Sequence, residues 1–255
     1  NPISNRSREL VKQHHFDSAY DMGVYAPEAD IDRVRTLYPG MEVEQASEFV
    51  YELPGTLEDG RADLTRLEEE LTRLRTDLSA WTADLPAQHP LTGEPFSPLQ
   101  LIAEQANRDE FKQLVEKCWQ REAALDDFGD SLEPTYELSI RPIIIGELPT
   151  LSADFSHVSA LELLSEDGLT RAGRFLEAFP NLKSLRLRNY TLGDIPDAVF
   201  NMGKLRSLSL PDCRVSLSAE SASALAGMDQ LDYLDLGFNP LIHTPDLSQM
   251  PGLAT

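Results

Sequence analysis

Residues 231–241 read LDYLDLGFNPL, and their apolar side chains follow a fixed spacing. Leucine fills the first, fourth, sixth and eleventh positions, and Asn239 fills the ninth. Residues 205–215 (LRSLSLPDCRV) keep this pattern with Cys213 in ninth place, and residues 182–192 (LKSLRLRNYTL) keep its leucines. Because side chains alternate between the two faces of a strand, the fourth and sixth leucines point the same way. Each stretch therefore predicts a short strand with one apolar side.

The pattern returns at a regular interval. Val158 begins an earlier copy, and the starting points at 158, 182, 205 and 231 lie 24, 23 and 26 residues apart. This template and interval are typical of leucine-rich repeats, in which each unit adds one strand and its leucines to a shared core. We expect residues 131–255 to form such a solenoid, with a parallel strand per repeat and a further repeat opening at Leu253. Leu138 and Ile140 mark a leading strand.

The ninth position of each repeat needs a short side chain that can form hydrogen bonds with the backbone as the chain leaves the strand. Cys213 and Asn239 suit this structural ladder. Glu166 and Tyr190 occupy the same place in the other two repeats and do not suit it, although Asn189 lies one residue earlier. We expect those two turns to be irregular.

Residues 1–130 predict an acidic helical region that caps the repeats, so the fold class is α+β. Between residues 60 and 85 the apolar residues are spaced three and four apart, as on one stripe of a helix, namely Leu64, Leu67, Leu71, Leu74, Leu78, Trp81 and Leu85. A second helix is expected at 99–127, after the prolines at 86, 90, 95 and 98. The stripe favours an antiparallel hairpin with this helix; a coiled-coil dimer is the alternative.

The overall composition disfavours some partners. The chain has 22 basic and 43 acidic residues, a formal net charge of −21, which repels phosphate backbones and anionic lipid. The longest strongly apolar run, at residues 143–145, is far shorter than a membrane-spanning helix. We therefore expect neither a nucleic-acid partner nor a membrane span. Two cysteines without a larger cysteine framework favour free thiols in a reducing compartment.

Candidate catalytic and metal-binding residues are few. Cys213 stands where the repeat template asks for Asn or Cys, and Cys118 lies on the apolar stripe of a predicted helix, so both are interpreted as structural. His14 and His15 are too close together to ligate one metal from a helix face. The sequence also lacks the CxxC, HExxH, P-loop and nucleophile-elbow motifs. We predict no catalytic residue, no metal and no cofactor in this chain.

A family resemblance adds to this interpretation. The repeats, together with LYPG at residues 37–40, CWQR at 118–121 and FSHV at 155–158, resemble large Pseudomonas-type effector or toxin-like proteins. The resemblance implies a C-terminal ubiquitin ligase domain of the NEL type, for which the repeats select the substrate. Such a domain uses a Cys-x-Asp motif. Neither cysteine here is followed by that motif, so the ligase would lie beyond Thr255.

The strand period also names the side chains that the core does not use. The central outward column is Ser139, Glu162, Arg186, Ser209 and Asp235. Arginine and tyrosine are frequent interface anchors, so Arg186, Arg188 and Tyr233 are the first candidates for contacting a partner protein, with Glu162, Ser209 and Asp235 beside them. The alternative is that Arg186 only pairs with Glu162 and Asp235 on neighbouring strands.

Two functions remain open at this stage. The chain is expected to be the substrate-recognition region of a bacterial effector ubiquitin ligase, secreted and acting in the host cytoplasm. Alternatively, it is an interaction or scaffold module of a toxin-like protein without ligase activity. Both give the concave strand face a protein partner, and ubiquitin machinery would be engaged only through a domain outside this chain.

Overall fold

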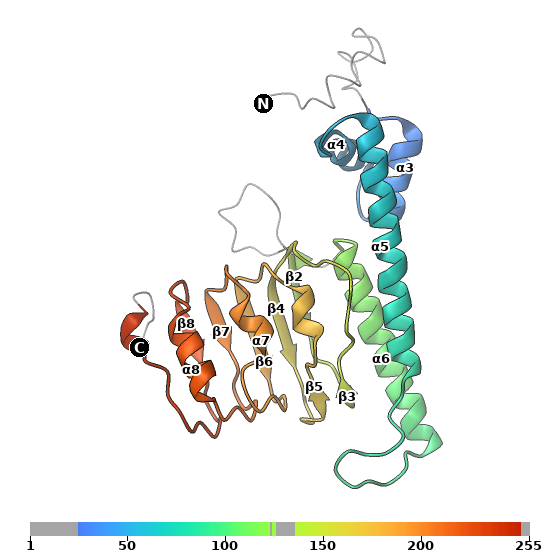
Figure 1. Cartoon of the computed structure of the whole chain (residues 1–255). Helices are drawn as coiled ribbons and strands as arrows, with labels where there is room; N and C mark the ends of the chain where they lie inside the picture. The colour runs from blue at the N-terminus through green and yellow to red at the C-terminus, as the bar shows by residue number, and fades with distance from the viewer. Residues whose placement is uncertain (1–24, 123, 126–135, 251–255) are drawn as a thin grey trace. The chain divides into compact units, whose positions relative to one another are not determined.

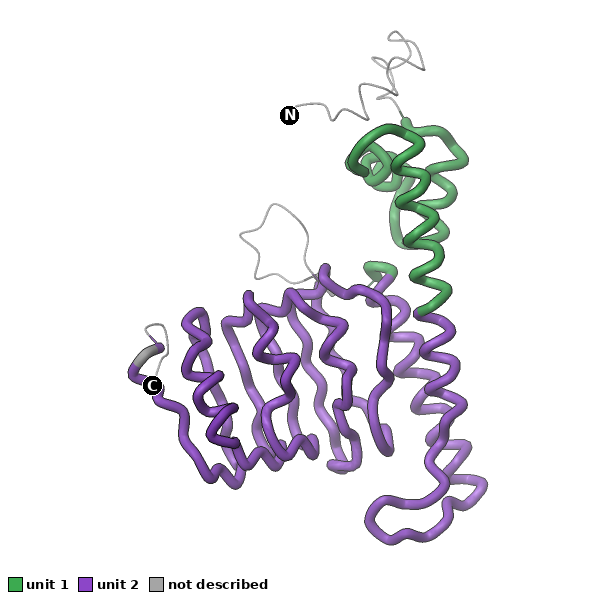
Figure 2. Tube along the Cα trace, in the orientation of Figure 1, with its two compact units in different colours: residues 1–73, 120–122 green, residues 74–119, 123–255 purple. Residues whose placement is uncertain are grey.

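The computed structural model describes residues 25–122, 124–125 and 136–250 (Figure 1). The chain divides into two compact units (Figure 2): unit 1 contains residues up to 73 together with 120–122, and unit 2 contains 74–119 and the residues from 123 onwards. The boundary expected between residues 130 and 131 lies outside the described residues, as do His14, His15 and Leu253.

Unit 1 contains α3 (Glu28–Leu37), α4 (Val43–Glu52) and the beginning of α5 (Leu57–Ala83). Its core contains Ile31, Val34, Leu37, Ala46, Val50, Leu64 and Leu71. The buried carboxylate of Asp30 accepts hydrogen bonds from Arg61 at 3.0 and 3.2 Å, which satisfies its charge. The Arg121 guanidinium lies 5.0 Å from the centre of the Tyr38 ring, a cation–π arrangement.

Unit 2 begins with the end of α5 and with α6 (Pro98–Trp119). Leu74 and Leu78 are buried, and the Trp81 ring lies 5.3 Å from the Phe111 ring of α6. Of the predicted apolar stripe, Leu64, Leu71, Leu74 and Leu78 are buried, and Leu67, Trp81 and Leu85 are half-buried. The contact between Trp81 and Phe111 is the one that a hairpin requires. The predicted end of the second helix at 127 is wrong, because α6 stops at Trp119 and β1 (Ala124–Leu125) follows.

A sheet occupies the rest of unit 2, in the strand order β1-β2-β4-β6-β7-β8. β1 is antiparallel to β2, and the other neighbours are parallel. The strands after β1 are β2 (Tyr136–Ile140), β4 (Val158–Leu164), β6 (Ser184–Arg188), β7 (Ser207–Ser209) and β8 (Tyr233–Asp235). A separate parallel pair joins β3 (Gly146–Glu147) to β5 (Thr170–Arg171). The described chain is thus mixed α+β with a parallel sheet of five strands.

Leucines stand in register across this sheet. Leu161 pairs with Leu185, Leu185 with Leu208, and Leu208 with Leu234. The first three are buried, whereas Leu234 in the last strand is half-buried. Burying one leucine side chain contributes about 1.5–3 kcal/mol, so each strand depends on its neighbours for stability.

Short helical segments follow the strands on one side of the sheet. They are η1 (Phe175–Ala178), α7 (Asp197–Phe200), α8 (Ala219–Ala226) and η2 (Leu247–Gln249). Figure 1 shows α7 and α8 in front of the strands. Phe175, Val199 and Leu225, one from each of the first three segments, are buried and close the core from this side. Among the described residues of unit 2, no helix covers the opposite side of the sheet.

Candidate binding surface

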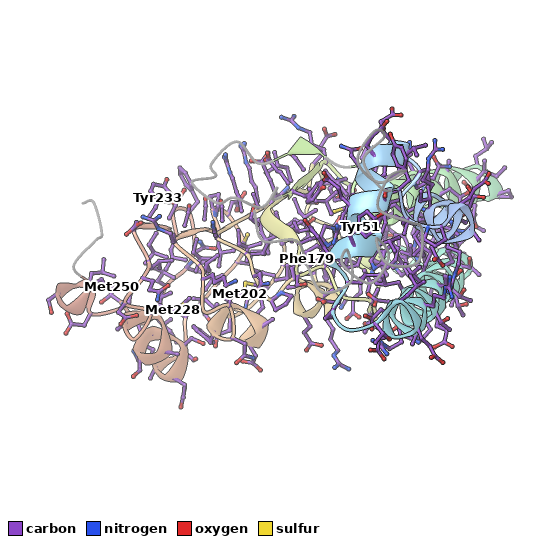
Figure 3. The ribbon with its side chains drawn as sticks, turned by 90° about the horizontal axis from the view of Figure 1, so that it is seen from above. Tyr51, Phe179, Met202, Met228, Tyr233 and Met250 are labelled. Carbon is purple, nitrogen blue, oxygen red and sulfur yellow. The ribbon has the colours of Figure 1, made fainter. Side chains whose placement is uncertain are left out.

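The open face is the side of the sheet away from α7 and α8. Figure 3 places Tyr233 on this side, and Met202 and Met228, which follow α7 and α8, on the other. Its central column has the predicted register: Ser139 pairs with Glu162, Glu162 with Arg186, Arg186 with Ser209, and Ser209 with Asp235. The predicted alignment of these five residues in one column is therefore confirmed.

A hollow of about 410 Å³ lies on the open face. Its lining combines small side chains with longer charged and aromatic ones; the lining residues are Glu137, Ala160, Leu161, Glu162, Ser184, Arg186, Ser207, Ser209, Tyr233 and Asp235. All belong to strands β2, β4, β6, β7 and β8. The hollow is therefore built on hydrogen-bonded strands, which hold its walls in place.

Polar contacts organise the hollow. A guanidinium nitrogen of Arg186 lies 3.9 Å from a carboxylate oxygen of Glu162, and Ser139 donates a hydrogen bond of 3.3 Å to that carboxylate. Asp235 accepts hydrogen bonds from the Ser209 hydroxyl at 3.4 Å and from the Gly237 N–H at 2.8 Å. The Arg186–Glu162 contact is long and partly exposed, so it contributes about 0–1 kcal/mol. These side chains can exchange their present contacts for contacts with a partner.

Five of the six predicted partner-binding residues line the hollow: Glu162, Arg186, Ser209, Tyr233 and Asp235. Arg188 is exposed at the end of β6, opposite Leu164, and does not line it. Glu137, Ser184 and Ser207 also line the hollow, at the strand position two residues before the central column. The period of two predicts that they point away from the core, but they were not among the residues predicted to contact a partner.

The two ladder residues hold the chain where it leaves the strands. The Asn239 amide donates to the carbonyl oxygens of Leu210, Leu236 and Gly237, and its oxygen accepts from the N–H groups of Cys213 and Val215. The Cys213 thiol donates to the Leu187 carbonyl oxygen, with sulfur and oxygen 3.3 Å apart. These contacts satisfy backbone groups beneath the open face and so keep β6, β7 and β8 in place.

The turn that contains Tyr190 departs from the pattern. Asn189 has a φ of 62° and donates to the carbonyl oxygens of Ser165 and Glu166. It thus performs, one residue early, the task that Asn239 performs in the last strand. Tyr190 is buried, and burial raises the pKa of its phenol.

Neither cysteine has the surroundings of a nucleophile. Burial raises the pKa of the Cys118 thiol to about 12 and that of the Cys213 thiol to about 11. A reactive cysteine instead has a lowered pKa beside a cation or a helix N-terminus. Across residues 25–122 and 136–250, no three His, Cys, Asp or Glu side chains are grouped so as to hold a metal ion.

Comparison with known proteins adds no assignment: no protein-family model and no curated protein matches the chain. No helix in the described ranges has both the length and the apolar character needed to cross a bilayer. The functional interpretation therefore depends on the open face itself.

Proposed function

We propose that this chain is a protein-binding leucine-rich repeat module and that the open face of its sheet holds the partner. The hollow of about 410 Å³ is the observation that carries this proposal. Apart from Leu161, it is lined by residues that stand outside the column of core leucines, on strands whose leucines are buried. A surface of this kind is extended, preformed and varied in chemistry, which suits recognition of a protein.

The regular features of unit 2 support the repeat assignment. The sequence repeats begin 24, 23 and 26 residues apart, the leucines pair in register, and Asn239 and Cys213 form hydrogen bonds at equivalent turns. Tyr233 supports the binding assignment, because about half of its side chain is exposed beside the hollow. Tyrosine offers a large contact area at low entropic cost, so it is frequent in protein interfaces.

We also propose that the module selects substrates for a bacterial effector ubiquitin ligase that is secreted and acts in the host cytoplasm. Two observations support this proposal. Residues 37–40, 118–121 and 155–158 resemble stretches of large Pseudomonas-type effector or toxin-like proteins, and the repeats follow from residue 158 onwards. In this proposal the chain supplies recognition and a separate domain supplies the thioester chemistry. A scaffold role in a toxin-like protein would use the same open face.

The test uses the full chain, immobilised and exposed to a eukaryotic cell lysate. Tyr233→Ala removes the exposed aromatic ring, and Ser184→Gln fills the hollow without changing its charge. Both variants should fail to retain the captured protein. The control variant Ser223→Gln, at an exposed position of α8, should still retain it. If both open-face variants capture the same proteins as the unchanged chain while their melting temperatures are unaltered, the open face is not the binding site.

A further inference from the structure

The hollow has an excess of negative charge. Glu137, Glu162 and Asp235 contribute three carboxylates, and Arg186 contributes the one guanidinium among its lining residues. Arg186 is already oriented towards Glu162, at 3.9 Å. Charge complementarity therefore favours a basic occupant.

One corner of the hollow combines two features that favour a cation. Tyr233 and Asp235 are two residues apart on β8, so their side chains leave the strand on the same side. The Tyr233 ring is half exposed, and both carboxylate oxygens of Asp235 are hydrogen-bond acceptors. A lysine or arginine side chain placed here would meet an aromatic face and a carboxylate together.

The second acidic corner lies across the sheet. Glu162 and Asp235 belong to the same column, separated by the strands that carry Arg186 and Ser209. Three strand spacings of about 4.8 Å separate them by about 14 Å. An extended chain advances about 3.3 Å per residue, so two of its side chains four residues apart span this distance and point the same way. The residue midway between them would lie over Arg186 and Ser209.

We propose that the hollow binds an extended segment of the partner with the charge order basic-x-acidic-x-basic. One lysine or arginine lies beside Tyr233 and Asp235, the other lies beside Glu162 and Glu137, and the central acidic side chain meets Arg186. This inference rests on the proposed function, since it specifies the chemistry of the partner at the same face. It assigns Arg186 a role in setting the register of the bound segment.

The probes are two labelled peptides of equal composition. One contains Lys-Ser-Glu-Ser-Lys within a neutral spacer, and the other has the same five residues in the order Lys-Lys-Glu-Ser-Ser. Fluorescence anisotropy of each peptide with the full chain measures binding. The first peptide should bind about tenfold more tightly, because only its order places both cations in the acidic corners. Equal affinities, or no binding of either peptide, would overturn the proposal.

Variants of the chain separate the hollow from the general negative charge. Asp235→Asn keeps the acceptor for the Gly237 N–H and removes one charge; it should weaken binding of the first peptide about tenfold. Glu220→Gln, at an exposed position of α8, removes the same charge away from the hollow. It should leave the affinity for the first peptide within about twofold of that of the unchanged chain. Tyr233→Phe should preserve binding, and Tyr233→Ala should weaken it, because the ring face and not the hydroxyl meets the cation. An equal effect of Asp235→Asn and Glu220→Gln contradicts the proposal.

Failure of this proposal is distinguishable from failure of the proposed function. If lysate capture depends on Tyr233 and Ser184 but the ordered peptide does not bind, the surface is a binding site for a segment of different chemistry. A different outcome would be that Asp235→Asn raises the affinity of the chain for the captured protein and Arg186→Gln lowers it. The bound segment would then be acidic at both corners, and the basic-x-acidic-x-basic order would be wrong.

Discussion

Single side chains set the stability of the turns that follow the strands. Asn239 forms five hydrogen bonds with backbone groups, whereas the Asn181 amide donates to the Ser156 carbonyl oxygen at 3.0 Å. A buried backbone group that loses its partner costs about 1–3 kcal/mol. The amount lost on removing an asparagine should therefore depend on how many backbone groups it satisfies.

We predict that Asn239→Ala lowers the free energy of unfolding by about 3 kcal/mol, and Asn181→Ala by about 1 kcal/mol. Urea unfolding measures both, with an unchanged m value showing that the two-state transition is preserved. Equal losses would show that water replaces the Asn239 contacts without cost.

The two thiols provide a second prediction at the same scale. Burial raises the pKa of Cys118 to about 12 and that of Cys213 to about 11, from an ordinary value of 9.0. At pH 8 both should therefore resist iodoacetamide in the folded chain and react once urea unfolds it. Because the unfolded thiols ionise first, their contribution to stability is full below pH 9 and is lost as the pH rises towards 11 and 12. Rapid labelling of the folded chain at pH 8 would contradict this burial.

The sequence predicted the positions of some side chains of the open face but not the shape of that face. The period of two placed the central column correctly, because the leucines of each strand must face the core. It did not predict the hollow, which exists because Ala160, Ser184 and Ser207 happen to be small between larger neighbours. The size of a depression depends on several strands at once, and no single repeat contains that information.

At the scale of elements, Arg108 joins three segments of unit 2. Its guanidinium donates to the carbonyl oxygens of Trp81, Asp84 and Ile145, and its Nε donates to Glu104 at 2.9 Å. Trp81 lies in the last turn of α5 and Asp84 directly follows the helix, where carbonyl groups lack the regular helical N–H partner four residues later. Glu104 also accepts the Ile145 N–H at 3.0 Å. The end of α5, α6 and the chain before β3 are thus fastened together.

We predict that Arg108→Met lowers the free energy of unfolding by about 3–5 kcal/mol, because it leaves the Glu104 carboxylate buried and unpaired. The double variant Glu104→Gln with Arg108→Met should be less destabilised than Arg108→Met alone. Arg75→Met is the matched control; its ion pair with Glu116 is partly exposed, so its loss should cost about 0–1 kcal/mol. A similar loss of stability for Arg75→Met and Arg108→Met would show that the Arg108 contacts do not hold these segments together.

The ends of elements were the least predictable feature. Ser97 and Gln100 cap the start of α6 by reciprocal hydrogen bonds, and Pro98 begins the helix, where its missing N–H costs nothing. The expected end at 127 failed because Leu125 continues the apolar pattern and yet belongs to β1, opposite Tyr136. Helical periodicity cannot distinguish a leucine on the same helix from one on an adjoining strand.

For the molecule as a whole, the net charge of −21 sets two opposite responses to salt. Repulsion among 43 acidic residues destabilises the folded chain at low ionic strength. Exposed ion pairs such as Arg206–Asp232 oppose this effect, but each contributes only about 0–1 kcal/mol. The excess of acidic over basic residues means that repulsion outweighs these pairs.

We predict that raising sodium chloride from about 0.01 M to about 0.15 M, which shortens the screening length from about 30 to 8 Å, raises the melting temperature by about 2–4 °C. The same change should weaken binding of the basic-x-acidic-x-basic peptide, because screening also reduces attraction to the acidic corners. Calorimetry and anisotropy in the same buffers measure the two responses. A lower melting temperature at the higher salt would mean that ion pairs dominate the surface. Peptide binding that does not change with salt would mean that apolar contact, and not charge, holds the segment in the hollow.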